Sequence, residues 1–324
     1  RAPIIRELSS AVMFSAASGC MPPRLTCCDA RDTMSRLWSL LNTHRMSFIA
    51  DSRGSTTARG LLAADEPAAF SVLDCPAPRY PVLLVCDHAS ARIPRSLQQL
   101  GLADEVLVQH IASDIGAADV VRALHEKLQV PAVLTNYSRL VIDCNRPVAH
   151  MHSISEISDE VVVPGNQKLS PAERALRFAE VFKPYHQAIA EQLAMLAEAD
   201  AAPVVIAIHS FTPLFAGFKR PWHCGILWDK DPRLAVPMLA ALRALQAFEV
   251  GDNEPYSGRH PEDYTIDTHA EAVGLPHVAI ELRQDLIAHA AGAEQWGGIL
   301  AAVVKPLLAD PQLFTRFKEA KHDH

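Results

Sequence analysis

The chain has 324 residues, 49% of them hydrophobic, and a net charge of −7 at pH 7. This length is enough for one large domain or two small ones with a well-buried core. The acidic balance argues against nonspecific nucleic-acid binding, which relies on clustered Lys and Arg. The apolar runs are far shorter than the ~20 residues of a membrane helix. The composition indicates a globular protein with a small-molecule partner and predicts no oligomeric state.

Seven cysteines occur, an odd number, and no short paired spacing is found in the body of the chain. A disulfide framework would show paired cysteines, whereas this usage favours a reducing compartment. We therefore expect a cytoplasmic protein.

Residues 1–75 differ from the remainder of the chain. They are rich in Ser, Ala, Arg and Thr, show little periodic core pattern, and contain the cysteine-bearing stretch "GCMPPRLTCCDA". We expect this segment to be a leader that is disordered or foreign to the natural protein, whose start would then be Met46. Residues 76–324 are expected to form a single α/β domain.

Short apolar runs alternate with helical patterns from Pro81 onward, which predicts a mainly parallel sheet covered by helices on both faces. The expected strands are 81–86, 131–136, 139–144, 203–208, 224–228 and 277–282. The expected helices are 116–129, 170–199, 232–246 and 286–309, the second starting with a capping box at Ser170. Two long polar loops remain, 147–158 and 251–276, and loops of this length are uncommon unless they are functional or disordered.

Polar side chains follow four of these strands. The first strand leads to His88, the third to Asn145 and Arg146, the fourth to His209 and Ser210, and the last to Glu281. Ligands of open α/β sheets collect at the carboxyl ends of strands. Because a catalytic zinc takes about three protein ligands and leaves one position open, two histidines and a carboxylate here indicate a mononuclear metal hydrolase.

His88 and His209 are the first two candidate metal ligands. Asp87, Asp114 and Glu281 are candidates for the third, and Asp114 is preferred because it directly precedes the helix that follows the first strand. The alternative role for Asp114 is to cap that helix. Glu281 suits a general base that takes a proton from water.

The stretch 138–147, "SRLVIDCNRP", carries unusual charge for a buried strand. Strand periodicity places Arg139 and Asp143 on one side and Arg146 on the other. Arg139 either pairs with Asp143 or faces the reacting carbonyl, and the sequence leaves both open. Arg146 offers a planar fork that matches a substrate carboxylate.

Other chemistries have weaker support. Ser90 and Ser210 suggest a serine hydrolase, but no G-x-S-x-G elbow occurs. Cys86 and Cys144 belong to apolar runs, where an inert packing role is expected. No G-x-G-x-x-G motif or P-loop supports a nucleotide cofactor.

Five motifs in order resemble the N-formylglutamate amidohydrolase family over about residues 80–310. They are "VLLVCDHASARIP", "SRLVIDCNRP", "HSFTP", "GDNEPYSG" and "HVAIELRQDLI". The resemblance implies a zinc carboxypeptidase-like or aspartoacylase-like fold, a three-layer α/β arrangement with a mixed, mainly parallel eight-stranded sheet flanked by helices. It also implies a zinc cofactor.

Carried onto this chain, the resemblance makes His88 and His209 zinc ligands, Asn145 and Arg146 a clamp for the substrate carboxylate, and Glu281 the general base. Relatives have a Glu three residues after the first His, and this chain has Ala91 there. Asp114 is therefore expected to replace that ligand. Arg139 is expected to polarise the scissile carbonyl or to hold the developing oxyanion. Ser210 and Tyr256 are expected to contact the substrate, Tyr256 as a cover or as a mere surface aromatic.

The resulting hypothesis is a zinc-dependent amidohydrolase that converts a small N-acyl amino acid with a free carboxylate, such as N-formyl-L-glutamate, into formate and the free amino acid. A second hypothesis is a carboxypeptidase-like or other N-acyl amino acid deacylase. A third, from a different class, is a metal-free small-molecule binding protein that keeps the pocket.

Overall fold

The computed structural model describes residues 60–197, 201–259 and 263–318. The chain divides into two units, and all described residues belong to the second, Thr57–His324. Most of the predicted leader, residues 1–59, lies outside the described residues. Its last part does not: β1 (Phe70–Leu73) pairs with β3 (Ala132–Thr135), so the fold begins before residue 76.

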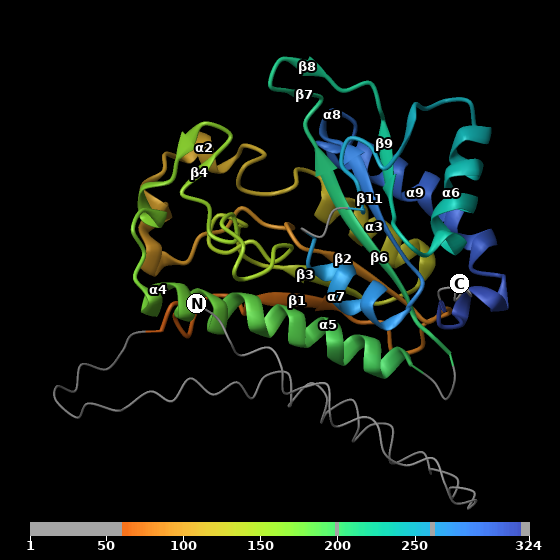
Figure 1. The fold of residues 1–324 in the computed structure, drawn as a ribbon, viewed down its shortest axis with the longest axis horizontal. Coiled ribbons are helices and arrows are strands. Elements are labelled where there is room, and N and C mark those ends of the chain that lie inside the picture. The colour runs from red at the N-terminus through yellow and green to blue at the C-terminus, as the bar shows by residue number, and fades with distance from the viewer. Residues whose placement is uncertain (1–59, 198–200, 260–262, 319–324) are drawn as a thin grey trace, which may run out of the picture. The chain divides into compact units, whose positions relative to one another are not determined.

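A seven-stranded sheet forms the middle layer of the described structure (Figure 1). Its order is β1-β3-β2-β6-β11-β9-β10. The neighbours β3, β2, β6 and β11 are parallel, β9 pairs antiparallel with β11, and β10 is parallel to β9. The remaining bounds are β2 (Val82–Cys86), β6 (Val204–Phe211), β9 (Cys224–Leu227), β10 (Val250–Asp252) and β11 (His277–Arg283). The predicted mixed, mainly parallel sheet is confirmed, with seven strands in the described residues where the resemblance implied eight.

The predicted strand 139–144 is wrong. Its backbone groups are used in turns: Val141 N donates to Ser138 O at 2.9 Å, and Asp143 N donates to Ser153 O at 2.7 Å. The buried Arg177 donates to Val141 O at 2.9 Å. These local partners replace a sheet ladder, so the apolar run is buried as a folded loop beside the sheet rather than inside it.

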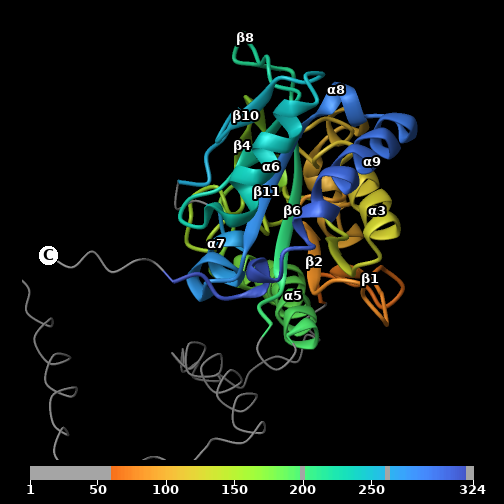
Figure 2. The same cartoon turned by 90° about the vertical axis from the view of Figure 1, so that its right-hand side faces the viewer.

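Helices cover both faces of the sheet. On one face α3 (Ala117–Leu128), α6 (Pro232–Ala244) and α9 (Ala290–Leu307) share a core with Val82 and Leu84 of β2. On the other face α5 (Lys183–Leu196) packs against Leu83 and Val85. Successive residues of β2 therefore enter different cores, as the period of two of a strand requires. Figure 2 shows α3 and α9 side by side.

The predicted helix 170–199 begins as expected, with Ser170 and Glu173 forming the capping box of α4 (Pro171–Arg177). It continues through a π-helical turn (Phe178–Phe182) into α5. No helix among the described residues is long and apolar enough to span a membrane. The remaining elements are η1 (Arg95–Gly101), α2 (Asp104–Leu107), β4 (Ile157–Ser158), β5 (Val161–Val162), η2 (Pro164–Asn166), β7 (Leu214–Phe215), β8 (Phe218–Lys219), α7 (Thr265–His269), η4 (Glu271–Val273), α8 (Gln284–Ile287) and η5 (Pro311–Phe314).

Candidate functional site

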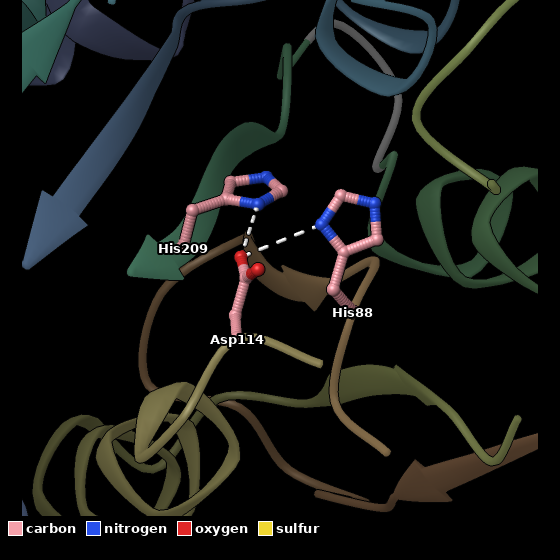
Figure 3. Close-up of side chains that lie close together, drawn as sticks. All are labelled: His88, Asp114 and His209. Carbon is pink, nitrogen blue, oxygen red and sulfur yellow. Dashed lines mark hydrogen bonds and ion pairs between the residues drawn. The ribbon is translucent and has the colours of Figure 1, made fainter. Parts of the chain in front are cut away.

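Three buried side chains meet at the carboxyl ends of the central strands: His88, Asp114 and His209 (Figure 3). His88 follows β2 by two residues, Asp114 precedes α3, and His209 lies in the last part of β6. One ligand atom from each lies within 4.8 Å of the others. The three residues predicted as metal ligands are therefore brought together, although they are up to 121 positions apart in the sequence.

The backbone places Asp114 in this group. Asp114 N donates to His88 O at 2.9 Å, which ties the start of α3 to the end of β2. Gly116, at φ +80°, allows the chain to turn into α3, and a Cβ there would lie 2.2 Å from Ile287 O. No side chain in the described part of the chain caps α3. Asp114 therefore faces the two histidines and does not act as the helix cap that the sequence left as an alternative.

Each imidazole is oriented by a second carboxylate. His88 Nε2 lies 2.7 Å from Asp143 Oδ1, and His209 Nε2 lies 3.2 Å from Asp87 Oδ2. Asp87 is itself held by Tyr185, whose hydroxyl donates to Asp87 Oδ1 at 2.8 Å. The Nδ1 atoms of both histidines consequently point at Asp114 Oδ2, from which His88 is 3.4 Å and His209 2.9 Å away. Metal-binding histidines characteristically have such a partner on the second ring nitrogen.

The charges around the group favour a cation. Burial alone would lower the pKa of His209, but its contacts with Asp114 and Asp87 outweigh burial and raise that pKa well above the usual value. Burial and the charge of Arg139 would both lower the pKa of His88. The charges of Asp143 and Asp114 outweigh them and raise that pKa above its usual value. Because three carboxylates surround two imidazoles, the space between them carries a negative potential that favours positive charge.

A divalent metal ion fits this donor set. Two imidazole nitrogens and one carboxylate oxygen are the usual protein ligands of a zinc ion that keeps an open coordination position. The three donors are buried, their ligand atoms face one another, and both imidazoles have their second nitrogen engaged by carboxylates. The group thus has the composition and geometry of a metal site, and its donors alone do not identify the metal.

Glu281 stands beside this group on β11, in register with His209 of β6. Glu281 is 7% exposed, and its Oε2 atom has no hydrogen-bond partner among the described residues. Burial raises the pKa of Glu281 to about 8. On its other side Glu281 pairs with Gly225 of β9, where a Cβ would lie 1.9 Å from Glu254 O. A buried glutamate with an unused carboxyl oxygen beside a candidate metal site is placed where it could exchange a proton.

Arg139 forms the ion pair with Asp143 that the sequence suggested as one of two alternatives. Its Nη2 donates to Asp143 Oδ2 at 2.7 Å, so the ion pair forms although the segment is no strand. Its Nη1 lies 3.6 Å from Asp114 Oδ1, and Arg139 also lines the cavity described below. The guanidinium therefore pairs with Asp143 and faces the metal group at the same time.

Asn145 and Arg146 lie in the cavity wall, where they contact the segment 263–265. Asn145 Oδ1 accepts from the backbone N–H groups of Tyr264 and Thr265, both at 3.0 Å. Asn145 Nδ2 donates to Asp263 Oδ1 at 3.2 Å, and Arg146 Nη1 lies 3.9 Å from the same oxygen. The predicted clamp thus has a carboxylate of the protein itself in contact with it.

A cavity of about 640 Å³ connects these residues. Its wall contains all nine predicted site residues, namely His88, Asp114, Arg139, Asn145, Arg146, His209, Ser210, Tyr256 and Glu281. Tyr256 is 45% exposed and stacks under Arg220, whose guanidinium carbon lies 5.0 Å from the ring centroid. The Ser210 hydroxyl donates to Ile115 O at 3.0 Å. A cavity of this size suits a small-molecule ligand.

Sequence reasoning missed two features of this site. Asp143 was expected only as a partner of Arg139, yet it also orients His88. Asp263 was not identified at all. The one available signal was its place in the long polar loop 251–276, since loops of that length are often functional.

The comparisons with known proteins agree with this architecture. The family model described as N-formylglutamate amidohydrolase matches residues 80–288. A crystal structure of a gene product from Agrobacterium tumefaciens is 38% identical, with a TM-score of 0.73, and covers 77% of this chain and 98% of its own.

The crystal structure of an N-formylglutamate amidohydrolase from Ralstonia eutropha is 16% identical, with a TM-score of 0.60, and covers 76% of this chain and 99% of its own. At that identity the likeness concerns the fold. The comparison with curated proteins gave no match. The matched family model spans well over half of the 324 residues and includes the whole buried His-Asp-His group. The chain therefore belongs to the N-formylglutamate amidohydrolase family.

Proposed function

We propose that this protein hydrolyses the amide bond of a small N-acyl amino acid with a free carboxylate, with N-formyl-L-glutamate as the first candidate, and that zinc is its metal. The observation that carries the proposal is the buried group of His88, Asp114 and His209 with Glu281 beside it. The family to which the chain belongs supports the same substrate class.

His88, Asp114 and His209 would hold the zinc ion. A zinc ion bound there supplies Lewis-acid chemistry, which polarises an acyl carbonyl and makes water more acidic. The negative potential of Asp87, Asp114 and Asp143 would retain the ion, and the cavity provides an open side from which substrate reaches it.

Glu281 would act as the base and then as the acid. It takes a proton from the attacking water as the new C–O bond forms at the acyl carbon, and it delivers that proton to the amine nitrogen as the C–N bond breaks. The products are formate and the free amino acid in the case of an N-formyl substrate. The position of Glu281 suits this exchange, because it is buried beside the candidate ligands and its Oε2 atom has no hydrogen-bond partner among the described residues.

Arg139 would stabilise negative charge on the acyl oxygen, since its guanidinium faces the cavity beside Asp114. Asn145 and Arg146 would bind the carboxylate of the substrate, and Tyr256 and Ser210 would line its path.

We infer a single domain from residue 60 onward that acts in a reducing, cytoplasmic setting.

The test has two parts. Metal content of the purified protein should be close to one zinc per chain, and the double variant His88→Ala/His209→Ala should lose it, whereas His150→Ala, outside the cavity wall, should keep it. A hydrolysis screen over N-formyl, N-acetyl and peptidyl amino acids, read as free amine, should then be strongest for N-formyl-L-glutamate.

The alternatives give different results in the same assays. If N-acetyl or peptidyl substrates are cleaved faster than N-formyl-L-glutamate, the protein is another deacylase or a carboxypeptidase-like enzyme. A protein that holds no stoichiometric metal and cleaves no amide after zinc is added would leave only the small-molecule binding function.

A further inference from the structure

The predicted carboxylate clamp is in contact with a carboxylate of the protein. Asp263 Oδ1 accepts a hydrogen bond from Asn145 Nδ2 at 3.2 Å and lies 3.9 Å from Arg146 Nη1. The side chains of Asp263 and Arg146 are 30% and 26% exposed, and both line the 640 Å³ cavity. A carboxylate that enters this cavity and reaches the clamp meets Asp263 there.

The residues that follow Asp263 hold it in place. The N–H groups of Tyr264 and Thr265 both donate to Asn145 Oδ1 at 3.0 Å. The Thr265 hydroxyl donates to Asp87 Oδ1 at 2.6 Å. Both ends of the Asn145 amide are therefore used by residues 263–265, and the contact with Asp263 follows from the way this loop is anchored.

Two carboxylates at one clamp repel each other. Asn145 and Arg146 present a small number of donors, and a second carboxylate within about 4 Å of Asp263 would face a like charge in a partly buried place. Burial already disfavours the charged form of Asp263, whose pKa lies above the usual value for that reason. A ligand whose only recognisable group is a carboxylate must displace Asp263, whereas a larger substrate offsets that cost with further contacts in the cavity.

We propose that Asp263 sets the affinity of the clamp, as an internal carboxylate that competes with the substrate carboxylate for Asn145 and Arg146. The proposal rests on the function proposed above. Asp263 lowers the affinity of the site for small carboxylates and leaves the chemistry at the acyl group unchanged. Asp263 is in this sense a residue that sets binding affinity, not a catalytic one.

The test uses the variant Asp263→Asn in the full-length, zinc-loaded protein. Asparagine keeps an oxygen that accepts from Asn145 Nδ2, so the loop anchor is retained while the negative charge is removed. Glu254→Gln is the matched control, because Glu254 is another carboxylate in the wall of the same cavity. Binding of glutarate is measured by calorimetry, and KM and kcat are measured with N-formyl-L-glutamate.

Asp263→Asn should bind glutarate about tenfold more tightly than the wild type and lower KM by a similar factor, with kcat within about twofold, because like-charge repulsion at the clamp is removed. Glu254→Gln should change glutarate affinity by less than about threefold. Glutarate binding that is unchanged, weaker or absent in Asp263→Asn would overturn the proposal, as would an equal gain in Glu254→Gln. A purely structural role for Asp263 predicts weaker binding, the opposite sign.

The two proposals fail separately. If the wild type cleaves N-formyl-L-glutamate and glutarate binds equally to the wild type and to Asp263→Asn, the competition is disproved and the proposed function stands. A wild-type protein that cleaves no acyl amino acid disproves the function, and the glutarate comparison still decides whether Asp263 competes at the clamp.

Discussion

Asp143 links the loop 138–147 to the candidate metal site through a hydrogen bond of 2.7 Å to His88 Nε2. The other carboxylate oxygen of Asp143 accepts from Arg139 at 2.7 Å. One buried carboxylate thus orients a candidate ligand and balances the charge of a cavity-lining arginine. Burial opposes ionisation of Asp143, but Arg139 and His88 outweigh it and hold the pKa well below the usual value.

Replacing this carboxylate should weaken metal binding. Asp143→Asn keeps the shape of the side chain and removes the charge that supports His88, so zinc affinity should fall roughly 10- to 100-fold. Competition with a chelator measures this loss. Asp285→Asn removes a carboxylate from an exposed pair with Arg283 and serves as the control. Equal zinc affinity in Asp143→Asn and the wild type would show that His88 needs no such support.

Glu281→Gln should separate metal binding from turnover. Glutamine has nearly the same volume and cannot carry the transferred proton, so turnover should fall by about 10²- to 10⁴-fold while zinc content stays at the wild-type level. Metal analysis and the free-amine assay on one preparation check both statements. Turnover that survives this change would remove Glu281 from the role of base.

Arg146→Ala should raise KM for carboxylate-bearing substrates by roughly tenfold or more, since a hydrogen bond to a charged group contributes about 1.5–3 kcal/mol. Kinetics with N-formyl-L-glutamate and with its two amide-capped analogues show whether the loss follows one carboxylate. Arg146→Lys keeps the charge without the planar fork and should be intermediate. The same loss on all three substrates would contradict a carboxylate clamp.

Asp267 should make stability depend on pH. Burial, reinforced by the charges of Asp263 and Glu271, raises its pKa from 3.8 to about 7 in the folded state. The folded protein then binds more protons than the unfolded protein between about pH 4 and pH 7, so this residue costs stability as pH rises through that window. Asp267→Asn should therefore gain stability relative to the wild type at pH 8 and little at pH 4.

Urea unfolding at pH 4, 6 and 8 measures that difference. Asp119→Asn, on the exposed side of α3, corrects for the loss of one negative charge at the surface. A difference that does not vary with pH would mean that Asp267 titrates alike in both states.

Gly225→Ala should destabilise the cavity wall. A Cβ at this position would lie 1.9 Å from Glu254 O, so either β9 or the segment that leads to Tyr256 must shift, at a cost of about 1–3 kcal/mol. Gly298→Ala in α9 is the control, because among the described residues the atom nearest to its Cβ, Lys127 Cε, would lie 3.9 Å away, and alanine favours helix. Thermal unfolding of both variants compares them, and equal stability would contradict the clash.

Much of the molecule could be predicted from local patterns. Apolar runs bounded by turn residues identified β2, β6 and β11, and the rule that ligands collect at strand ends placed His88, His209 and Glu281 near one another. The capping box at Ser170 was likewise readable, because its donors and acceptors lie within four residues. These features depend on neighbours in the sequence or on the general geometry of parallel sheets.

The tertiary structure alone decided the contacts that join distant segments. The run 139–144 has the composition of a strand, yet it folds into turns because Ser153 and Arg177 take its backbone groups. Asp143 reaches His88 across 55 positions and Asp263 reaches Asn145 across 118, and neither pair has a local pattern. Periodicity reports which side of an element faces the core, whereas the partner of a buried charge depends on how separate elements pack, and only the folded chain determines that.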